Sequence, residues 1–182
     1  MLTTYDEFVN DQIQYGGKKY AHSNDREVTD VLTDIYGVLG LLWTIHKYVY
    51  RYYNVGREKD LLKIGAYMYI LWLKYGFHLA GEPAQRLYDT NVRTKEAHFG
   101  QFVDQVNTWA NDVIPAKVDL ELTSTREKLD TLLASLKYFK HRVSLLQIYF
   151  MVRDAWNTTF RASDAHETDT WGDEKFKKES SG

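Results

Sequence analysis

Apolar residues recur three and four positions apart along almost the whole of this 182-residue chain. That spacing places them on one face of an α-helix, whereas a half-buried strand needs alternation with a period of two, and no run alternates in that way. Only two prolines, Pro83 and Pro115, interrupt the pattern. We therefore expect an all-α fold, a single helical bundle of about five or six helices with a long C-terminal helix.

The first helix is predicted from its capping residues. It should start after Thr3 or Thr4, because an acid, Asp6 or Glu7, follows each of them at capping-box spacing. The Gly16–Gly17 pair is expected to end it, because glycine loses more conformational freedom in a helix than any other residue.

The middle of the chain is expected to hold three more helices. The first runs from about residue 28 to residue 53 as one long core helix, because its apolar side chains form a single stripe: Val28, Val31, Leu32, Ile35, Leu39, Leu42, Ile45 and Val49. The next covers residues 57–75 and turns inward Leu61, Ile64, Met68, Leu71 and Trp72. A further amphipathic helix ends before Pro115 and carries Phe99, Phe102, Val103, Val106 and Trp109.

The last helix is predicted to begin at a capping box formed by Ser124 and Glu127 and to run to about Arg161. Its apolar residues alternate three and four positions apart, as in a coiled coil, along Leu129, Leu132, Leu136, Phe139, Val143, Leu146 and Phe150. Such a packing seam requires a partner helix, either within the bundle or from another subunit. Residues 1–161 are thus expected to form the bundle domain and residues 162–182 a polar C-terminal tail.

Composition excludes several classes of function. The chain has no cysteine, so it has no disulfide, no thiolate zinc site and no cysteine nucleophile. Residues 1–20 carry acids and no long apolar stretch, which argues against a signal or transit peptide, and no apolar run approaches the ~20 residues of a membrane span. We therefore expect a cytoplasmic protein that has no association with a membrane.

Three carboxylates, Glu27, Asp30 and Asp34, occupy positions i, i+3 and i+7. A helix would align them on one face, and carboxylate oxygens in such a row suit a hard divalent cation such as Mg²⁺. Acids are also common in the first turn of a helix simply because they complement its dipole. Both interpretations stay open, and we otherwise expect no cofactor.

Cations and aromatic residues alternate between residues 47 and 57. The side chains concerned can pair with phosphates and stack on bases, and they form a possible nucleic-acid patch made of Lys47, Tyr50, Arg51, Tyr53 and Arg57. The same pattern arises where amphipathic side chains line the rim of a bundle. It indicates nucleic-acid binding only as an alternative.

The stretch from Leu32 to Phe102 resembles the MazG-like all-α nucleotide pyrophosphohydrolases in its order of elements. The matching segments read Gly37-Val38-Leu39-Gly40-Leu41, Arg57-Glu58-Lys59-Asp60-Leu61-Leu62-Lys63-Ile64-Gly65-Ala66, Tyr75-Gly76-Phe77 and Asn91-Val92-Arg93-Thr94-Lys95. The resemblance implies a magnesium-dependent hydrolase fold with nucleotide contacts at Asn91, Arg93 and Lys95.

The chain departs from that family at its metal-binding acids. Those acids would fall near Leu41, Thr44, Lys63 and Ala66, none of which is acidic. No side chain at these positions supplies the negative charge that the family uses to hold its magnesium against a developing phosphate charge. The resemblance therefore predicts a related fold without the family's magnesium mechanism.

No arrangement of residues indicates a catalytic site, so we expect a non-enzymatic helical-bundle protein that binds a protein partner or assembles into a homo-oligomer. The first alternative is a metal-dependent nucleotide pyrophosphohydrolase of MazG-like type, with its acids drawn from Glu27, Asp30, Asp34 and Asp60. The second is a nucleic-acid-binding protein that uses the tyrosine-rich basic patch.

Overall fold

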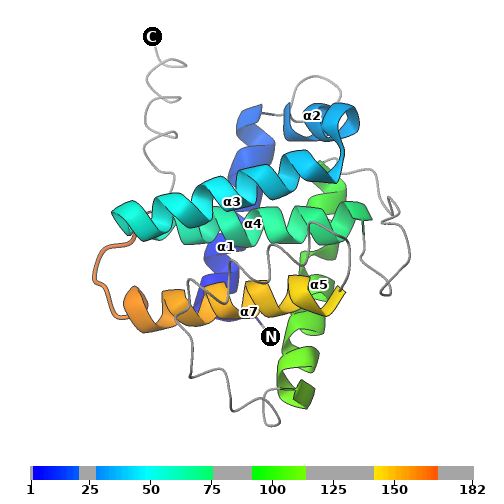
Figure 1. Cartoon of the computed structure of the whole chain (residues 1–182). Helices are drawn as coiled ribbons and strands as arrows, with labels where there is room; N and C mark the ends of the chain where they lie inside the picture. Colours follow the sequence, from blue (N-terminus) through cyan, green and yellow to red (C-terminus); the bar gives the residue numbers. More distant parts are fainter. Residues whose placement is uncertain (1, 21–27, 76–91, 114–141, 168–182) are drawn as a thin grey trace.

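The computed structural model describes residues 2–20, 28–75, 92–113 and 142–167, which form six helices and no strand (Figure 1). The helices are α1 (Thr4–Tyr20), α2 (Val28–Tyr36), α3 (Val38–Val55), α4 (Glu58–Tyr75), α5 (Val92–Val113) and α7 (Arg142–Thr159). The predicted all-α fold is confirmed for this part of the chain. No described helix is long and apolar enough to cross a membrane.

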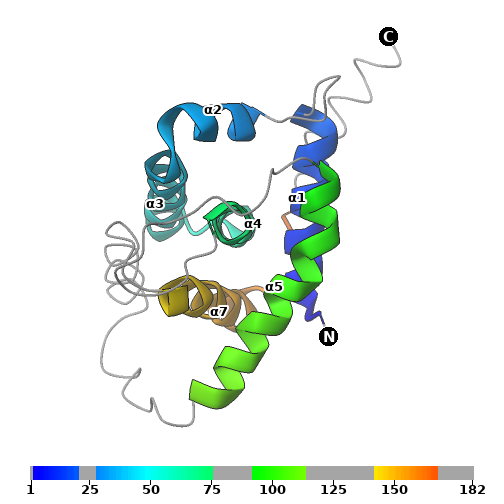
Figure 2. The ribbon, with the colours of Figure 1, turned by 90° about the vertical axis from the view of Figure 1, so that its right-hand side faces the viewer.

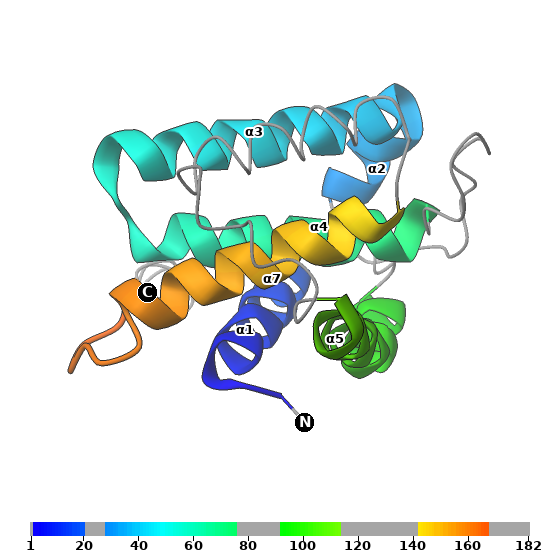
Figure 3. The same cartoon turned by 60° about the horizontal axis from the view of Figure 1, so that its bottom comes forward.

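Helix α4 lies at the centre of the fold. Figure 2 shows it end-on, surrounded by α1, α3, α5 and α7, and Figure 3 shows α3 on one side of it and the other three on the opposite side. A helix that is apolar around most of its circumference is stable only when it is enclosed in this way. The side chains predicted to face the core from this helix are all buried: Leu61, Ile64, Met68, Leu71 and Trp72.

Helices α3 and α4 form an antiparallel hairpin because Gly56 ends α3. Its φ of 72° lies in the left-handed region that glycine adopts without strain, and its N–H donates a 2.7 Å hydrogen bond to the Tyr52 carbonyl. The predicted start of the second of these helices, Arg57, differs by one residue from the observed start. The predicted end, Tyr75, is the observed one.

The predicted capping box at the start of α1 is confirmed. The backbone N–H of Thr3 donates to Asp6 Oδ2 at 2.8 Å, and the Asp6 N–H donates to Thr3 Oγ1 at 3.4 Å. The prediction that the Gly16–Gly17 pair ends this helix is wrong, because α1 continues to Tyr20. A glycine costs a helix only about 1 kcal/mol, so the continuing helix, which packs on α4 and α5, tolerates both of them.

The prediction of one long core helix over residues 28–53 is also wrong. Gly37 has a φ of 70°, which breaks the run into α2 and α3, and its N–H closes α2 by donating to the Thr33 carbonyl at 2.7 Å. After the break only part of the apolar stripe faces the core. Leu42, Ile45 and Val49 are buried, whereas four residues that precede them along the stripe are exposed: Val31, Leu32, Ile35 and Leu39.

Helix α5 carries the predicted core residues, with Phe99, Phe102, Val103, Val106 and Trp109 buried. The C-terminal helix is described only from Arg142 to Thr159, so its predicted start at Ser124 and the first four seam residues, Leu129 to Phe139, lie outside the described residues. In α7, Leu146 is buried and Phe150 packs against the core. The first residues of the predicted tail, up to Glu167, fold back against the start of α4 (Figure 1).

Candidate interaction groove

The large hydrophobic side chains that are exposed gather on two helices. Within the described residues every one of them lies on α2 or α3: Val31, Leu32, Ile35, Tyr36, Leu39, Trp43, Tyr50 and Val55. Trp43 leaves 66% of its surface exposed, although tryptophan buries more apolar area than any other side chain when it packs. An isolated exposed apolar residue needs no explanation, but a group confined to two consecutive helices marks an interaction surface.

A groove of about 350 Å³ lies between α2, α3 and the outer side of α4. Leu32 and Tyr36 of α2 line one end, Trp43 and Tyr48 of α3 continue it, and Tyr67 of α4 stacks on Tyr48 with ring centres 5.8 Å apart. Figure 2 shows that α2 runs in a different direction from α3, and Gly37, with its positive φ, is the residue between the two helices.

Gly40 lies on α3 among the residues that line the groove. A Cβ atom at this position would meet only the Tyr36 Cβ at 3.6 Å, an ordinary van der Waals contact. The Gly40 carbonyl accepts a 2.9 Å hydrogen bond from the Thr44 hydroxyl, so the polar groups beside the glycine are satisfied within the helix. A larger residue at position 40 would therefore occupy the groove without displacing the backbone.

Three cations surround the ring of Tyr48 at the other end of the groove. Lys47 Nζ lies 4.8 Å from the ring centre, Lys63 Nζ 5.3 Å and the Arg51 guanidinium 5.5 Å. Cations at these distances are attracted to the electron-rich face of the ring, which offsets part of their mutual repulsion. The groove therefore has an apolar end on α2 and a cationic end beside Tyr48, where only Lys47 lines the groove itself and also lies 5.4 Å from the ring centre of Trp43.

Asp60 lies beneath the cationic end and is fully buried. Its Oδ1 is 3.7 Å from Arg51 Nη2, and neither carboxylate oxygen accepts a hydrogen bond from the residues described. Burial raises the pKa of the Asp60 carboxyl above its usual value, despite the opposing influence of Arg51, Lys63 and two other nearby cations. The carboxylate balances Arg51 in particular and is closed off from ligands.

No family model, curated protein sequence or solved structure matches this chain. The functional role of the groove is therefore inferred from its own geometry. Two other clusters of buried polar groups lie elsewhere in the bundle, and both hold helices together.

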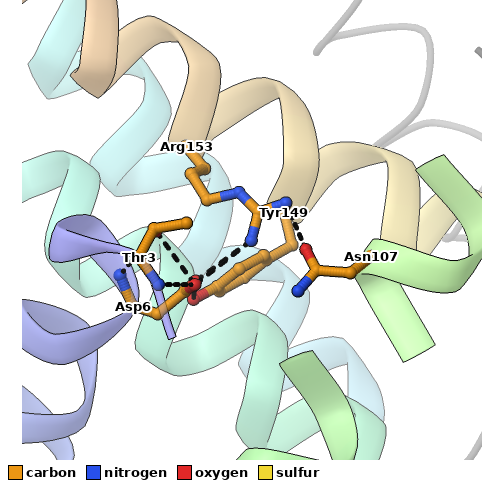
Figure 4. Close-up of polar contacts among 5 residues, drawn as sticks. All are labelled: Thr3, Asp6, Asn107, Tyr149 and Arg153. Carbon is orange, nitrogen blue, oxygen red and sulfur yellow. Dashed lines mark hydrogen bonds and ion pairs between the residues drawn. The ribbon is translucent and has the colours of Figure 1, made fainter. Parts of the chain in front are cut away.

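The first cluster centres on the Asp6 carboxylate, which is fully buried between α1, α5 and α7 (Figure 4). It accepts hydrogen bonds from the Tyr149 hydroxyl at 2.8 Å, from Arg153 Nη1 at 3.2 Å and from Thr3. Arg153 also donates to Asn107 of α5 at 2.8 Å. Because each charged group in the cluster is buried and paired, it has no face open to a substrate, and its role is to join the three helices.

The second cluster joins α4 to the segment that follows α7, and its centre is Glu58. Glu58 Oε1 accepts from Trp156 Nε1 at 3.0 Å and lies 2.7 Å from His166 Nδ1, while Oε2 accepts from the Glu167 N–H at 2.7 Å. His166 also stacks on Trp156, with ring centres 5.6 Å apart. We call this set the Glu58 clasp, since it fastens residues 160–167 to the first turn of α4.

The residues predicted for a metal or nucleotide site are only partly described. Glu27 and Asn91 lie outside the described residues, as do the side chains of Asp30, Arg93 and Lys95, and Asp34 is exposed on α2. Among the described residues no group of three or more His, Cys, Asp or Glu side chains is placed to hold a metal ion. Asp34 does not line the groove.

The structure brings together part of the predicted nucleic-acid patch. Lys47 and Arg51 meet at Tyr48, which lies in the same run of sequence, whereas Tyr50 is exposed and Tyr53 packs against Tyr52. Arg57 lies in the turn after α3, close enough to influence Asp60. Tyr48 itself is 8% exposed, so its ring is a support for cations and not a platform for a base.

At the positions where the resemblance would place the MazG-like metal acids, Leu41 and Thr44 line the groove, Lys63 lies over Tyr48 and Ala66 is buried. The sequence contained a signal that bears on the groove but does not decide between a continuous helix and a break. Gly37 and Gly40 lie within an apolar stripe on a long polar-flanked helix, and a break at either glycine would separate the stripe into a buried half and an open half.

Proposed function

We propose that this protein acts by binding another protein chain, either a different partner or a second copy of itself, through the groove between α2 and α3. The observation that carries the proposal is the confinement of all exposed large hydrophobic side chains of the described residues to these two helices. Monomeric proteins rarely expose contiguous apolar patches larger than a few hundred Å² unless the patch binds something.

The free energy available from covering this surface is large enough for specific binding. Trp43, Ile35 and Tyr36 are each more than three fifths exposed, and burying one such side chain contributes roughly 1.5–3 kcal/mol. Aromatic residues in the centre of an interface are also those whose truncation costs most. Trp43, which lines the groove, is therefore the residue expected to dominate the contact.

A variant at Gly40 tests the proposal, because it blocks the groove without removing any contact in the core. Light scattering on the purified chain should give a mass above that of the monomer, or a pull-down should retain a partner. Gly40→Gln should abolish the self-association or the partner binding that is observed. The matched control is Gly100→Gln, since Gly100 lies on an open face of α5. A strict monomer that retains no partner would contradict the proposal.

A second candidate is a metal-dependent nucleotide pyrophosphohydrolase. It rests on the resemblance alone, because Leu41 and Thr44 line the groove but supply no carboxylate for a metal. Incubation with a panel of nucleoside triphosphates and Mg²⁺ or Mn²⁺ distinguishes it from the first. Pyrophosphate release that Gly40→Gln removes would support it, and the absence of both release and a thermal shift with nucleotide would reject it.

A further inference from the structure

We propose that the segment bound in the groove is acidic and amphipathic: it places large apolar side chains in the apolar end and carboxylates against the cationic end. This inference rests on the proposed function and adds the chemistry of the partner. It is carried by a groove that Leu32 and Tyr36 line at the α2 end and that Lys47 and Tyr48 line at the other end, where Lys63 and Arg51 also lie around the Tyr48 ring.

The apolar end of the groove determines which apolar side chains the partner should carry. Leu32 and Tyr36, one helical turn apart on α2, face the same opening as Trp43 of α3. Aliphatic and aromatic walls of this kind are covered most favourably by side chains such as Leu, Phe or Met, spaced to follow one face of a helix. Gly40, which contributes no side chain to this stretch, leaves room for one of them.

The cationic end of the groove determines the charge that the partner should carry. Of its three cations, Arg51 forms an ion pair with the buried Asp60 at 3.7 Å, and Lys63 is close enough to influence the same carboxylate. No carboxylate among the residues described forms an ion pair with Lys47 or Lys63, although their Nζ atoms lie within 5.3 Å of the same ring centre. Cations gathered around one ring, two of them without an ion pair among the described residues, favour a partner that brings negative charge.

A nucleic acid would supply negative charge but would leave most of the groove uncovered. Phosphate and sugar offer no apolar surface to Leu32, and the Tyr48 ring, already covered by cations, cannot stack on a base. An acidic peptide satisfies both ends at once. Charge at the rim of such an interface also selects partners, because a basic segment of the same shape would be repelled.

Two synthetic peptides of about 18 residues, or about five helical turns, provide the test. Both carry the same Leu and Phe residues on one face, and the opposite face is Glu in one peptide and Lys in the other. Fluorescence anisotropy with the full-length chain should show that the Glu peptide binds at least about tenfold more tightly than the Lys peptide at low salt. A single-stranded oligonucleotide of about 20 nucleotides is measured alongside them.

Two variants separate the contribution of the groove's shape to peptide binding from the contribution of its charge. Gly40→Gln should weaken the Glu peptide by about tenfold or more, with Gly100→Gln unchanged. Lys47→Glu should weaken binding of the Glu peptide and strengthen binding of the Lys peptide. Arg161→Glu makes the same change of net charge on an exposed residue after α7, and it should alter the affinity for neither peptide. Circular dichroism spectra and melting temperatures show that each variant is folded.

Three results would overturn the inference. Equal binding of the two peptides, with both blocked by Gly40→Gln, would leave a protein-binding groove but remove its acidic partner. If the oligonucleotide binds more tightly than either peptide, and its binding is sensitive to Lys47→Glu and insensitive to Gly40→Gln, the cations bind phosphate and not an acidic peptide. If no peptide binds while Gly40→Gln abolishes self-association, the groove receives a second copy of this chain and not an acidic segment.

Discussion

The Tyr149 hydroxyl donates a 2.8 Å hydrogen bond to the Asp6 carboxylate across 143 positions of sequence, and both residues are fully buried. Asp6 thus serves twice, since it also caps the helix on which it lies. Burial of this kind raises the pKa of the Tyr149 hydroxyl well above its usual value, and the nearby Asp6 charge raises it further. The hydroxyl therefore remains a hydrogen-bond donor throughout the range in which proteins are stable.

Removing Arg153 should destabilise the fold strongly. Arg153→Met would leave the Asp6 charge buried without its cation, a loss expected to lower the free energy of unfolding by about 3–5 kcal/mol. Urea denaturation measures this. Arg161→Met, the same substitution on an exposed residue, should change stability by less than about 0.5 kcal/mol, and a comparable loss in both variants would show that the Asp6 cluster carries no special weight.

Gly65 should tolerate no side chain. A Cβ atom there would overlap the Tyr5 hydroxyl and approach Val9 Cγ2 to 2.9 Å, and Tyr5 is fixed because it donates a 2.7 Å hydrogen bond to the Leu61 carbonyl. We expect Gly65→Ala to cost about 1–3 kcal/mol through overpacking. Gly100→Ala, in an open part of α5, should instead stabilise the chain by about 0.5–1 kcal/mol. Thermal melts that rank the two variants in the opposite order would contradict this packing.

Charge on the Asp60 carboxyl should cost stability at neutral pH. Because the pKa of Asp60 is raised in the folded protein, the folded state binds the proton more tightly than the unfolded chain, where the pKa is about 3.9. The stability that protonated Asp60 contributes to the folded state is thus fully present below about pH 4. It is lost as pH rises through the raised pKa of the folded protein. Asp60→Asn should therefore be more stable than the wild type at pH 7, and the two should converge below pH 4.

The exposed Asp154→Asn variant is the control for this pH dependence. Urea titrations at several pH values give the stability of each protein. A lower stability of Asp60→Asn at pH 7 would mean that the attraction between Asp60 and Arg51 outweighs the cost of burial.

Glu58→Gln should release the segment after α7. The amide of glutamine offers one oxygen to two N–H donors, Trp156 Nε1 and the Glu167 backbone, and turns its own NH₂ group toward one of them. We expect a loss of about 1–3 kcal/mol and faster hydrogen exchange at the Glu167 amide. Glu167→Gln, which keeps the backbone N–H, should leave that exchange rate unchanged, and unaltered exchange in Glu58→Gln would exclude the Glu58 clasp.

The helical periodicity was sufficient to predict the fold class and the inward faces of α4 and α5, because a core that surrounds a helix imposes the spacing directly. It was not sufficient at Gly37. Glycine is compatible with a continuous helix and with a break, and the choice depends on packing between residues far apart. The buried carboxylates of Asp6 and Glu58 were missed for the same reason, since nothing local marks a charge as buried.

The groove illustrates a different limit. An apolar stripe on a helix looks the same in sequence whether it faces the core or an external partner, so Leu32 and Ile35 were assigned to the core with Leu42 and Ile45. Only the break at Gly37 separates the two halves. The cationic residues were recognised, but their common contact, Tyr48, became evident only when α3 and α4 were seen side by side.

Site-specific photocrosslinking tests the central claim most directly. A benzoylphenylalanine residue replaces Trp43 in the groove, and a control places it at Asp154 on the exposed face of α7. Irradiation in the cells that make this protein should yield a discrete protein adduct at position 43 that Gly40→Gln eliminates and that position 154 does not give. Identical adducts at both positions, or none at position 43, would show that the groove between α2 and α3 is not a protein-binding surface.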